Sequence, residues 1–237
     1  MERKTNRSDP SRNRLWQRIR SSIVFHLVLA VVLVSGVHGF LVKPYDIPSN
    51  SMEKTLESGD RIYVNRLQNR QSNPIHGQIV VFNASPDWGQ SAEGNVLKRI
   101  AGTAGDILGF GATNHHALVK RIIGVPGDTV SCCSATGTLM LNGNPIHENY
   151  VYDDFPFRYG SLDCETSPRS KRCFPPIVVQ TGKYLVLGDH RSDSNDSVYA
   201  CRGEKPSGNC SKQVAREDVV GPVLFRAWPP SRIGTVY

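Results

Sequence analysis

The feature that most constrains this chain is an uncharged apolar run close to its N-terminus. Residues 23–42 contain no Lys, Arg, Asp or Glu, and most of them are Val, Leu, Ile, Ala or Phe. A helix of twenty residues rises about 30 Å, which is the hydrocarbon thickness of a bilayer. The run therefore predicts a single transmembrane helix.

A buried core helix and the apolar core of a cleaved signal peptide are the alternatives. A basic segment precedes the run, as in a signal peptide. The run is longer than an ordinary signal-peptide core, however, and Lys43-Pro44-Tyr45 follows it in place of a small-residue cleavage site. We therefore expect an uncleaved signal anchor.

The positive charge of the chain is concentrated before this run. The 237 residues carry a formal net charge of +7, of which residues 1–20 contribute +5. Because the excess lies in a tail and not on a folded face, we expect no nucleic-acid partner. The positive-inside rule keeps the N-terminus in the cytoplasm. We expect a basic cytoplasmic tail at 1–22, an anchor in the lipid bilayer at 23–42 and an extracytoplasmic part at 43–237.

All six cysteines lie in the predicted extracytoplasmic part, where disulfides persist. They are Cys132, Cys133, Cys164, Cys173, Cys201 and Cys210. Eight residues separate Cys164 from Cys173, and eight separate Cys201 from Cys210, so local bridges are compatible with both pairs. The sequence leaves the pairing open. Zinc is the other interpretation, but no Cys-x-x-Cys or His-x3-His spacing occurs, which disfavours it. The sequence contains no phosphate-binding loop either, so we expect neither a metal nor a cofactor.

Short β-rich runs recur after residue 43, without a long helical period. They lie at 61–64, 78–82, 117–123, 129–131, 138–141, 177–179, 184–187 and 219–226. Asn142-Gly143 predicts a hairpin turn within them. We expect a mostly β ectodomain, with long polar loops at about 83–117 and 153–176. A smaller inserted β/loop region is expected at 130–180.

Residues 47–52, Ile-Pro-Ser-Asn-Ser-Met, place two serines two positions apart just beyond the predicted anchor. This spacing allows one hydroxyl to lie beside the N–H and Oγ of the other, as a nucleophile and an oxyanion hole require. Asn50 suits a tight turn or a positive φ. An ordinary polar turn is the alternative.

A serine nucleophile needs a base, which histidine or lysine can provide. Asp189-His190 would suit a Ser/His/Asp triad. A Ser/Lys dyad needs a lysine whose pKa falls from about 10.4 by about 2–3 units through burial. Lys120 suits this role because residues 117–119 and 122–123 around it are apolar. Lys98 lies in a similar segment with more polar neighbours.

Four segments resemble, in order, the motifs of the bacterial type I signal peptidases. They are the nucleophile motif at 47–56, the Gly-Asp-Ile-Val-Val-Phe strand at 77–82, the lysine motif at 120–128 and the Gly-Asp-Asn-Arg-x-x-Ser-x-Asp-Ser-Arg motif at 188–197. The anchor and the Trp-Pro-Pro-Ser-Arg run at 228–232 also resemble this family. The adjacent cysteines at 132 and 133, followed by Asn142-Gly143, resemble its actinobacterial branch.

The resemblance implies roles by position. Ser51 would be the nucleophile, and Lys120 the general base in preference to Lys98, because Pro126-Gly127-Asp128 completes the motif at Lys120. Ser49 Oγ and the Ser51 N–H would stabilise the oxyanion.

Other residues would support this pair. Ser194 would hydrogen-bond the lysine and orient it. The structural residues near the site would be Asp189, Arg191 and Asp196. The residues lining shallow pockets for small substrate side chains would be Ile47, Pro48, Met52, Leu56, Leu118 and Val119.

Four positions depart from the family pattern. Lys54 replaces Pro, Gln78 replaces Asp, His190 replaces Asn and Val198 replaces Arg. Because Val198 is uncharged, the usual ion pair with Asp196 is lost unless Arg191 or Arg202 substitutes.

The resemblance implies an anchored serine endopeptidase with a signal-peptidase-like Ser/Lys ectodomain. It would remove signal peptides from preproteins that the export machinery delivers to the cell membrane. An inactive or specialised anchored homologue is one alternative. A Ser/Lys self-cleaving regulator is another, but it would need a DNA-binding helix-turn-helix, and the sequence shows none.

Overall fold

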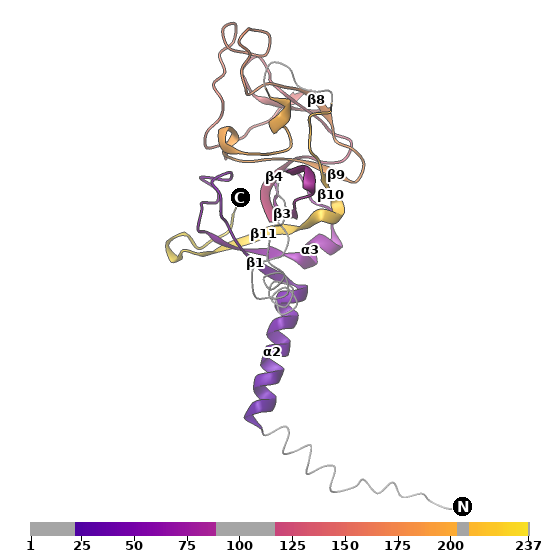
Figure 1. Cartoon of the computed structure of the whole chain (residues 1–237), viewed down its shortest axis with the longest axis vertical. Helices are drawn as coiled ribbons and strands as arrows, with labels where there is room; N and C mark the ends of the chain where they lie inside the picture. The colour runs from indigo at the N-terminus through magenta and orange to yellow at the C-terminus, as the bar shows by residue number, and fades with distance from the viewer. Residues whose placement is uncertain (1–21, 89–116, 203–208, 237) are drawn as a thin grey trace, which may run out of the picture.

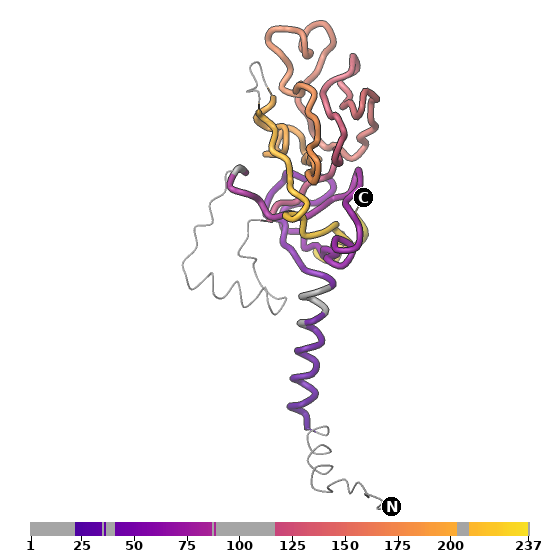
Figure 2. Tube along the Cα trace, turned by 90° about the vertical axis from the view of Figure 1, so that its right-hand side faces the viewer, coloured from indigo at the N-terminus to yellow at the C-terminus, as the bar shows by residue number. Residues whose placement is uncertain are grey.

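The computed structural model describes residues 22–88, 117–202 and 209–236. Two antiparallel sheets make up most of the regular structure in these ranges, as the β-rich runs predict. Helix α2 (Ile23–Phe40) projects from one end of the molecule, and the smaller sheet lies at the other end (Figures 1 and 2).

Helix α2 starts where the predicted anchor starts but ends before residue 42. Val42 is already the first residue of strand β1 (Val42–Asp46), where it pairs with Asn65. The predicted end of the apolar helix at residue 42 is therefore wrong, because Val42 pairs in strand β1 and Pro44 follows closely. No helix in the described ranges combines the length and apolar character required to cross a bilayer.

The larger sheet contains seven strands in the order β1-β2-β11-β3-β4-β9-β10. Besides β1 these are β2 (Arg61–Asn65), β3 (Ile79–Asn83), β4 (Ala117–Gly124), β9 (Lys183–Leu187), β10 (Val214–Ala215) and β11 (Val219–Trp228). The five predicted runs in this sheet are confirmed to within two residues. Strands β1 and β10 were not predicted, because one contains Pro44 and charged residues and the other has only two residues.

Strand β3 lies between β11 and β4, and residues 79–82 are all buried. A continuous apolar run is what a strand covered on both faces requires. The pairing of β3 with β4 sets Val80 opposite Lys120 and Ile79 opposite Arg121. The centre of the sheet therefore holds the lysine of interest among apolar residues.

The smaller sheet has the order β7-β6-β5-β8. Its strands are β5 (Thr129–Cys132), β6 (Leu139–Leu141), β7 (Asn144–Pro145) and β8 (Phe174–Val178). Asn142 and Gly143 have φ values of 51° and 79°, the left-handed backbone of a two-residue hairpin turn, so the predicted hairpin is confirmed. The limits of the inserted region at 130–180 stay a prediction.

Short helical segments complete the described fold. They are α3 (Arg66–Gln71) and the 3₁₀ turns η1 (Pro86–Trp88), η2 (Arg191–Asp193), η3 (Tyr199–Cys201), η4 (Arg216–Asp218) and η5 (Pro230–Arg232). Six residues are too few to show a helical period, so α3 was missed. Its N-cap is Asn65, whose side chain accepts a 2.9 Å hydrogen bond from Gln68 N–H.

Three disulfides pair all six cysteines. The pairs Cys164–Cys173 and Cys201–Cys210 agree with the local bridges that the spacing allowed, and Cys132 is bonded to Cys133. The sulfur atoms of Cys133, Cys164 and Cys173 lie within 4.8 Å of one another. A disulfide sulfur is not a thiolate, so this cluster offers no metal ligands in the oxidised protein.

Candidate active site

The two serines lie on the loop that joins β1 to β2. Backbone hydrogen bonds close the base of this loop, from Ile47 N–H to Asp60 and from Gly59 N–H to Ile47, both at 2.9 Å. Met52 and Leu56 fasten it to the core, with exposures of 1% and 0%. The loop is therefore held at both ends and in its middle, and Ser51 is buried on it.

The turn in this loop is where the sequence predicted it, but the positive φ is elsewhere. Glu53 N–H donates to the Asn50 carbonyl at 2.8 Å. The residue with positive φ, 73°, is Lys54, whose ammonium donates to the Asn149 carbonyl at 3.3 Å. A proline ring fixes φ near −65°, so proline could not adopt this backbone. Lys54, which stands where the family has a proline, therefore allows a positive φ that a proline could not adopt.

Strand β4 carries Lys120 to the serine loop. Lys120 Nζ lies 2.5 Å from Ser51 Oγ, and the residue is 3% exposed. Burial lowers the pKa of Lys120 from 10.5 to about 8, against the opposite effect of Asp196, Asp189 and Asp193. A buried amine with a lowered pKa loses its proton more easily, and the uncharged amine that results can accept a proton from a bonded hydroxyl. Lys98 lies outside the described residues.

Ser49 and Ser194 stand differently with respect to this pair. Ser49 Oγ is 3.4 Å from Ser51 Oγ and is exposed, as a group that meets a substrate must be. Ser194 Oγ is buried and has no hydrogen-bond partner within the described ranges. The predicted hydrogen bond from the Lys120 ammonium to Ser194 Oγ is therefore not formed in this structure, where Lys120 Nζ is directed to Ser51.

Gly188 is a site residue that the sequence reasoning missed. A Cβ at this position would lie 2.5 Å from the Ser51 carbonyl oxygen and 2.3 Å from Ser194 Oγ, closer than atoms can approach. The next segment also contacts the serine loop, since His190 N–H donates to the Ser51 carbonyl at 3.2 Å. A glycine directly after the buried strand β9 was the available signal.

Asp189 links the lysine strand to the serine loop. Its carboxylate accepts two hydrogen bonds from Arg121, at 2.9 and 2.6 Å, and one from Thr55 Oγ1 at 2.6 Å. The Arg121 guanidinium also lies 3.9 Å from the centre of the Tyr150 ring. Because Arg121 adjoins Lys120 and Thr55 lies on the serine loop, this buried ion pair sets the two segments relative to each other.

The structure distinguishes the two arginines that were considered as partners of Asp196. Arg191 Nε donates to the Gly188 carbonyl at 2.9 Å, and its guanidinium pairs with Glu148. Arg202 Nη2 lies 3.7 Å from Asp196 Oδ2. Of the two arginines, Arg202 is therefore the one that lies near Asp196.

His190 replaces the family's asparagine and makes its own contacts. Its Nδ1 lies 3.1 Å from Glu53 Oε2, and its Nε2 lies 3.7 Å from Asp153 Oδ2. The imidazole thus joins the serine loop to a loop next to the smaller sheet. Both ring nitrogens lie near carboxylates, and it is Lys120 that is bonded to Ser51 Oγ.

The predicted pocket residues are mostly packed inside. Ile47, Met52 and Leu56 belong to one buried cluster, and Val119 packs against it. Leu118 packs against a second cluster, and Pro48 is exposed. Their contact with substrate stays a prediction, and Leu56 has no surface to contribute without movement of the loop.

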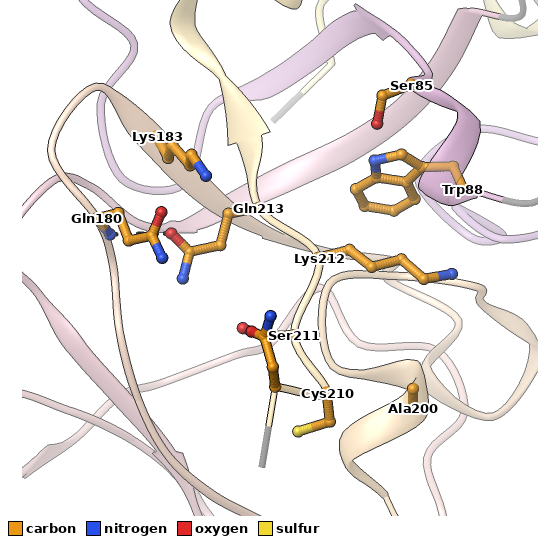
Figure 3. Close-up of a pocket in the computed structure, with 10 residues that line it drawn as sticks. Ser85, Trp88, Gln180, Lys183, Ala200, Cys210, Ser211, Lys212 and Gln213 are labelled. Atoms are coloured by element: carbon orange, nitrogen blue, oxygen red, sulfur yellow. Dashed lines mark hydrogen bonds between the residues drawn. The ribbon is translucent and has the colours of Figure 1, made fainter. Parts of the chain in front are cut away.

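A polar hollow lies away from these residues. It is lined by Ser85, Trp88, Gln180, Lys183, Lys212 and Gln213, among others (Figure 3). Lys212 Nζ is 5.7 Å from the centre of the Trp88 ring. None of the predicted site residues lines this hollow, so it is separate from the Ser51–Lys120 pair.

Comparison with known proteins defines the class of this protein. A family profile described as signal peptidase, peptidase S26, matches residues 20–112 and 104–228. The chain therefore belongs to this family of serine peptidases, as the four motifs predict.

Individual relatives carry the same name. A probable signal peptidase I of Mycobacterium leprae is 35% identical, over 92% of this chain and 80% of its own. The signal peptidase I of Mycobacterium tuberculosis is 36% identical, over 88% and 72%. A solved signal peptidase I from Enterococcus faecalis covers 64% of this chain and 97% of its own, at 22% identity and a TM-score of 0.35, too loose a likeness to argue from. The predicted actinobacterial-type resemblance is confirmed by the mycobacterial relatives.

Proposed function

We propose that this chain is a signal peptidase that removes N-terminal signal peptides from exported preproteins with a Ser51–Lys120 dyad. The observation that carries the proposal is the buried Lys120 amine 2.5 Å from Ser51 Oγ. Membership of the signal peptidase family supports the substrate class.

In the proposed reaction Lys120 takes the hydroxyl proton as Ser51 Oγ attacks the scissile carbonyl. Ser49 Oγ and the Ser51 N–H stabilise the oxyanion, each donor contributing about 3–4 kcal/mol in comparable sites. Lys120 then protonates the leaving amine, and water cleaves the acyl-enzyme. Ser194 Oγ, which is buried beside Gly188 and has no hydrogen-bond partner among the described residues, is available to accept a hydrogen bond from the ammonium that forms.

The pH dependence of cleavage tests this function. The full chain in detergent is assayed on a preprotein with alanine at positions −1 and −3. Only the neutral amine can act as the base, so kcat/KM should rise about tenfold per pH unit at low pH. It should level off as the pH passes about 8, the pKa of Lys120. Cleavage without an acidic limb contradicts a lysine base, and a folded chain without cleavage favours the inactive homologue.

We propose in addition that helix α2 attaches the chain to the cell membrane, with the part of the chain that follows it outside. Most of the apolar side chains between Ile23 and Val34 of α2 are exposed, with Ile23 at 77%, which supports an apolar surrounding for this part of the helix. The basic residues before it support a cytoplasmic N-terminus.

Carbonate extraction and protease treatment of spheroplasts test the attachment. The full chain should stay in the carbonate pellet and be digested from outside. A Leu29→Lys/Val32→Lys variant should move to the supernatant, because a lysine at the centre of a spanning helix costs about 2.5–3.5 kcal/mol. Full-length chain that carbonate releases would contradict the proposal.

A further inference from the structure

Asp196 is a buried carboxylate that works against the proposed base. It is 0% exposed, and its negative charge raises the pKa of Lys120, opposing burial. An anion close to an amine favours the ammonium form, which cannot accept a proton. The proposed function therefore needs something that offsets this charge.

The other acidic groups around Lys120 are already compensated. Asp189 is bound on two atoms by Arg121. Asp193 is exposed, so water screens it. Of these three carboxylates, Asp196 is the one whose negative charge still needs a cation beside it.

Arg202 is the cation that meets Asp196. The carboxylate has two backbone contacts, the Val198 N–H at 3.2 Å and the Gly188 N–H at 3.4 Å, and Arg202 Nη2 lies 3.7 Å from it. Arg191, the other nearby arginine, is bound to Glu148.

Contacts from the region of the smaller sheet hold Arg202 in place. Its side chain is 7% exposed, and its guanidinium lies 5.2 Å from the ring centre of Phe155 and 5.8 Å from that of Phe174. Nη1 donates to the carbonyls of Lys171 and Arg172 at 3.4 and 3.5 Å. Cys201, directly before it, is buried and bonded to Cys210.

The guanidinium is not fully satisfied there. Nε and Nη2 of Arg202 are buried and have no hydrogen-bond partner within the described ranges. Burying a cation with unmade hydrogen bonds costs free energy, and a hydrophobic side chain would pack here more favourably. Two acidic residues act on this guanidinium, Asp196 and Asp154, and Asp154 is already paired with Arg172 at 3.1 Å. Asp196 is therefore the negative charge that Arg202 is left to meet.

We propose that Arg202 is a positioning residue that neutralises Asp196 and so keeps Lys120 uncharged for its role as base. This inference rests on the proposed dyad. It assigns to the smaller sheet, through Phe174 of β8, a part in setting the charge state of a lysine on the larger one.

The pH profile of charge variants tests the proposal. Arg202→Gln removes the charge and should move the acidic limb of kcat/KM up by about one pH unit. Arg202→Lys keeps the charge and should leave the limb near its original position. Arg202→Gln combined with Asp196→Asn removes both charges and should return the limb. Arg61→Gln is the control for loss of a positive charge, since this exposed arginine pairs with Asp46 and should not shift the limb.

A readout without activity separates this inference from the proposed function. In protein labelled with ¹³Cε-lysine, the Lys120 resonance, assigned from its loss in Lys120→Arg, should titrate about one pH unit higher in Arg202→Gln than in the unchanged chain. The same midpoint in both, with thermal unfolding showing both folded, overturns the inference. A lower rate of cleavage without a shift of the limb means that Arg202 has a structural role only, which overturns the inference as well.

Discussion

Replacing Ser51 by alanine should lower kcat for preprotein cleavage by about 10⁶-fold, the scale of nucleophile removal in a serine protease. Replacing Lys120 by methionine should lower it by about 10²–10⁴-fold, the usual contribution of a general base. The two losses should not add, because the hydroxyl and the amine act on the same proton. Single-turnover cleavage of a labelled preprotein measures the rates of the two single variants and of the double variant.

Lys98→Ala is the matched control for the lysine variant. Lys98 lies in the segment that resembles the lysine motif but lacks its Pro-Gly-Asp ending, so this variant should cleave at the original rate. Thermal unfolding of each variant shows whether a lost rate reflects lost chemistry or lost structure. Unchanged cleavage by a folded Lys120→Met would remove the dyad from consideration.

Replacing Asp189 by alanine should lower the free energy of unfolding by about 3–5 kcal/mol, the cost of leaving a buried ion without its partner. Asp189 is 0% exposed and binds Arg121 on two atoms, and Thr55 uses the same carboxylate. Urea unfolding of the full chain in detergent, followed by tryptophan fluorescence, measures the change. The variant should also lose cleavage, because the serine loop loses a contact to the strand of Lys120.

A variant with both charges removed is the control for this ion pair. Arg121→Met combined with Asp189→Leu leaves no unpaired charge and should cost less than Asp189→Ala alone. If Asp189→Ala unfolds within about 1 kcal/mol of the unchanged chain, the pair behaves like an exposed surface pair, and its proposed role in holding the two segments together is wrong.

Prediction from sequence worked best where the signal was local. The runs that became β3, β4 and β9 were recognisable because apolar residues follow one another in strands that are covered on both faces. The Asn142-Gly143 turn was recognisable because few residue pairs adopt two left-handed conformations in succession. Strand β1 was not recognised because it starts inside the apolar run and contains Pro44, so the predicted helix ended two residues too late.

The site itself could be predicted only in part. Ser51 and Lys120 stand out because their motifs surround them in sequence, and the structure places them within hydrogen-bonding distance. The role of Gly188 was missed, since the atoms that exclude a Cβ belong to Ser51 and Ser194. The sequence named two substitutes for the lost arginine, and only packing chose Arg202 over Arg191.

The order of residues alone determined the family, the β-rich character and the choice of Lys120, because each depends on side chains that are near one another along the chain. Tertiary structure decided the charge environment of that lysine. Its burial, the ion pair of Arg121 with Asp189 and the approach of Arg202 to Asp196 depend on how strand β4 packs against the segment that follows β9. The free energy of an ionised group depends on all the charges and the water around it, and these are set only when distant segments pack together.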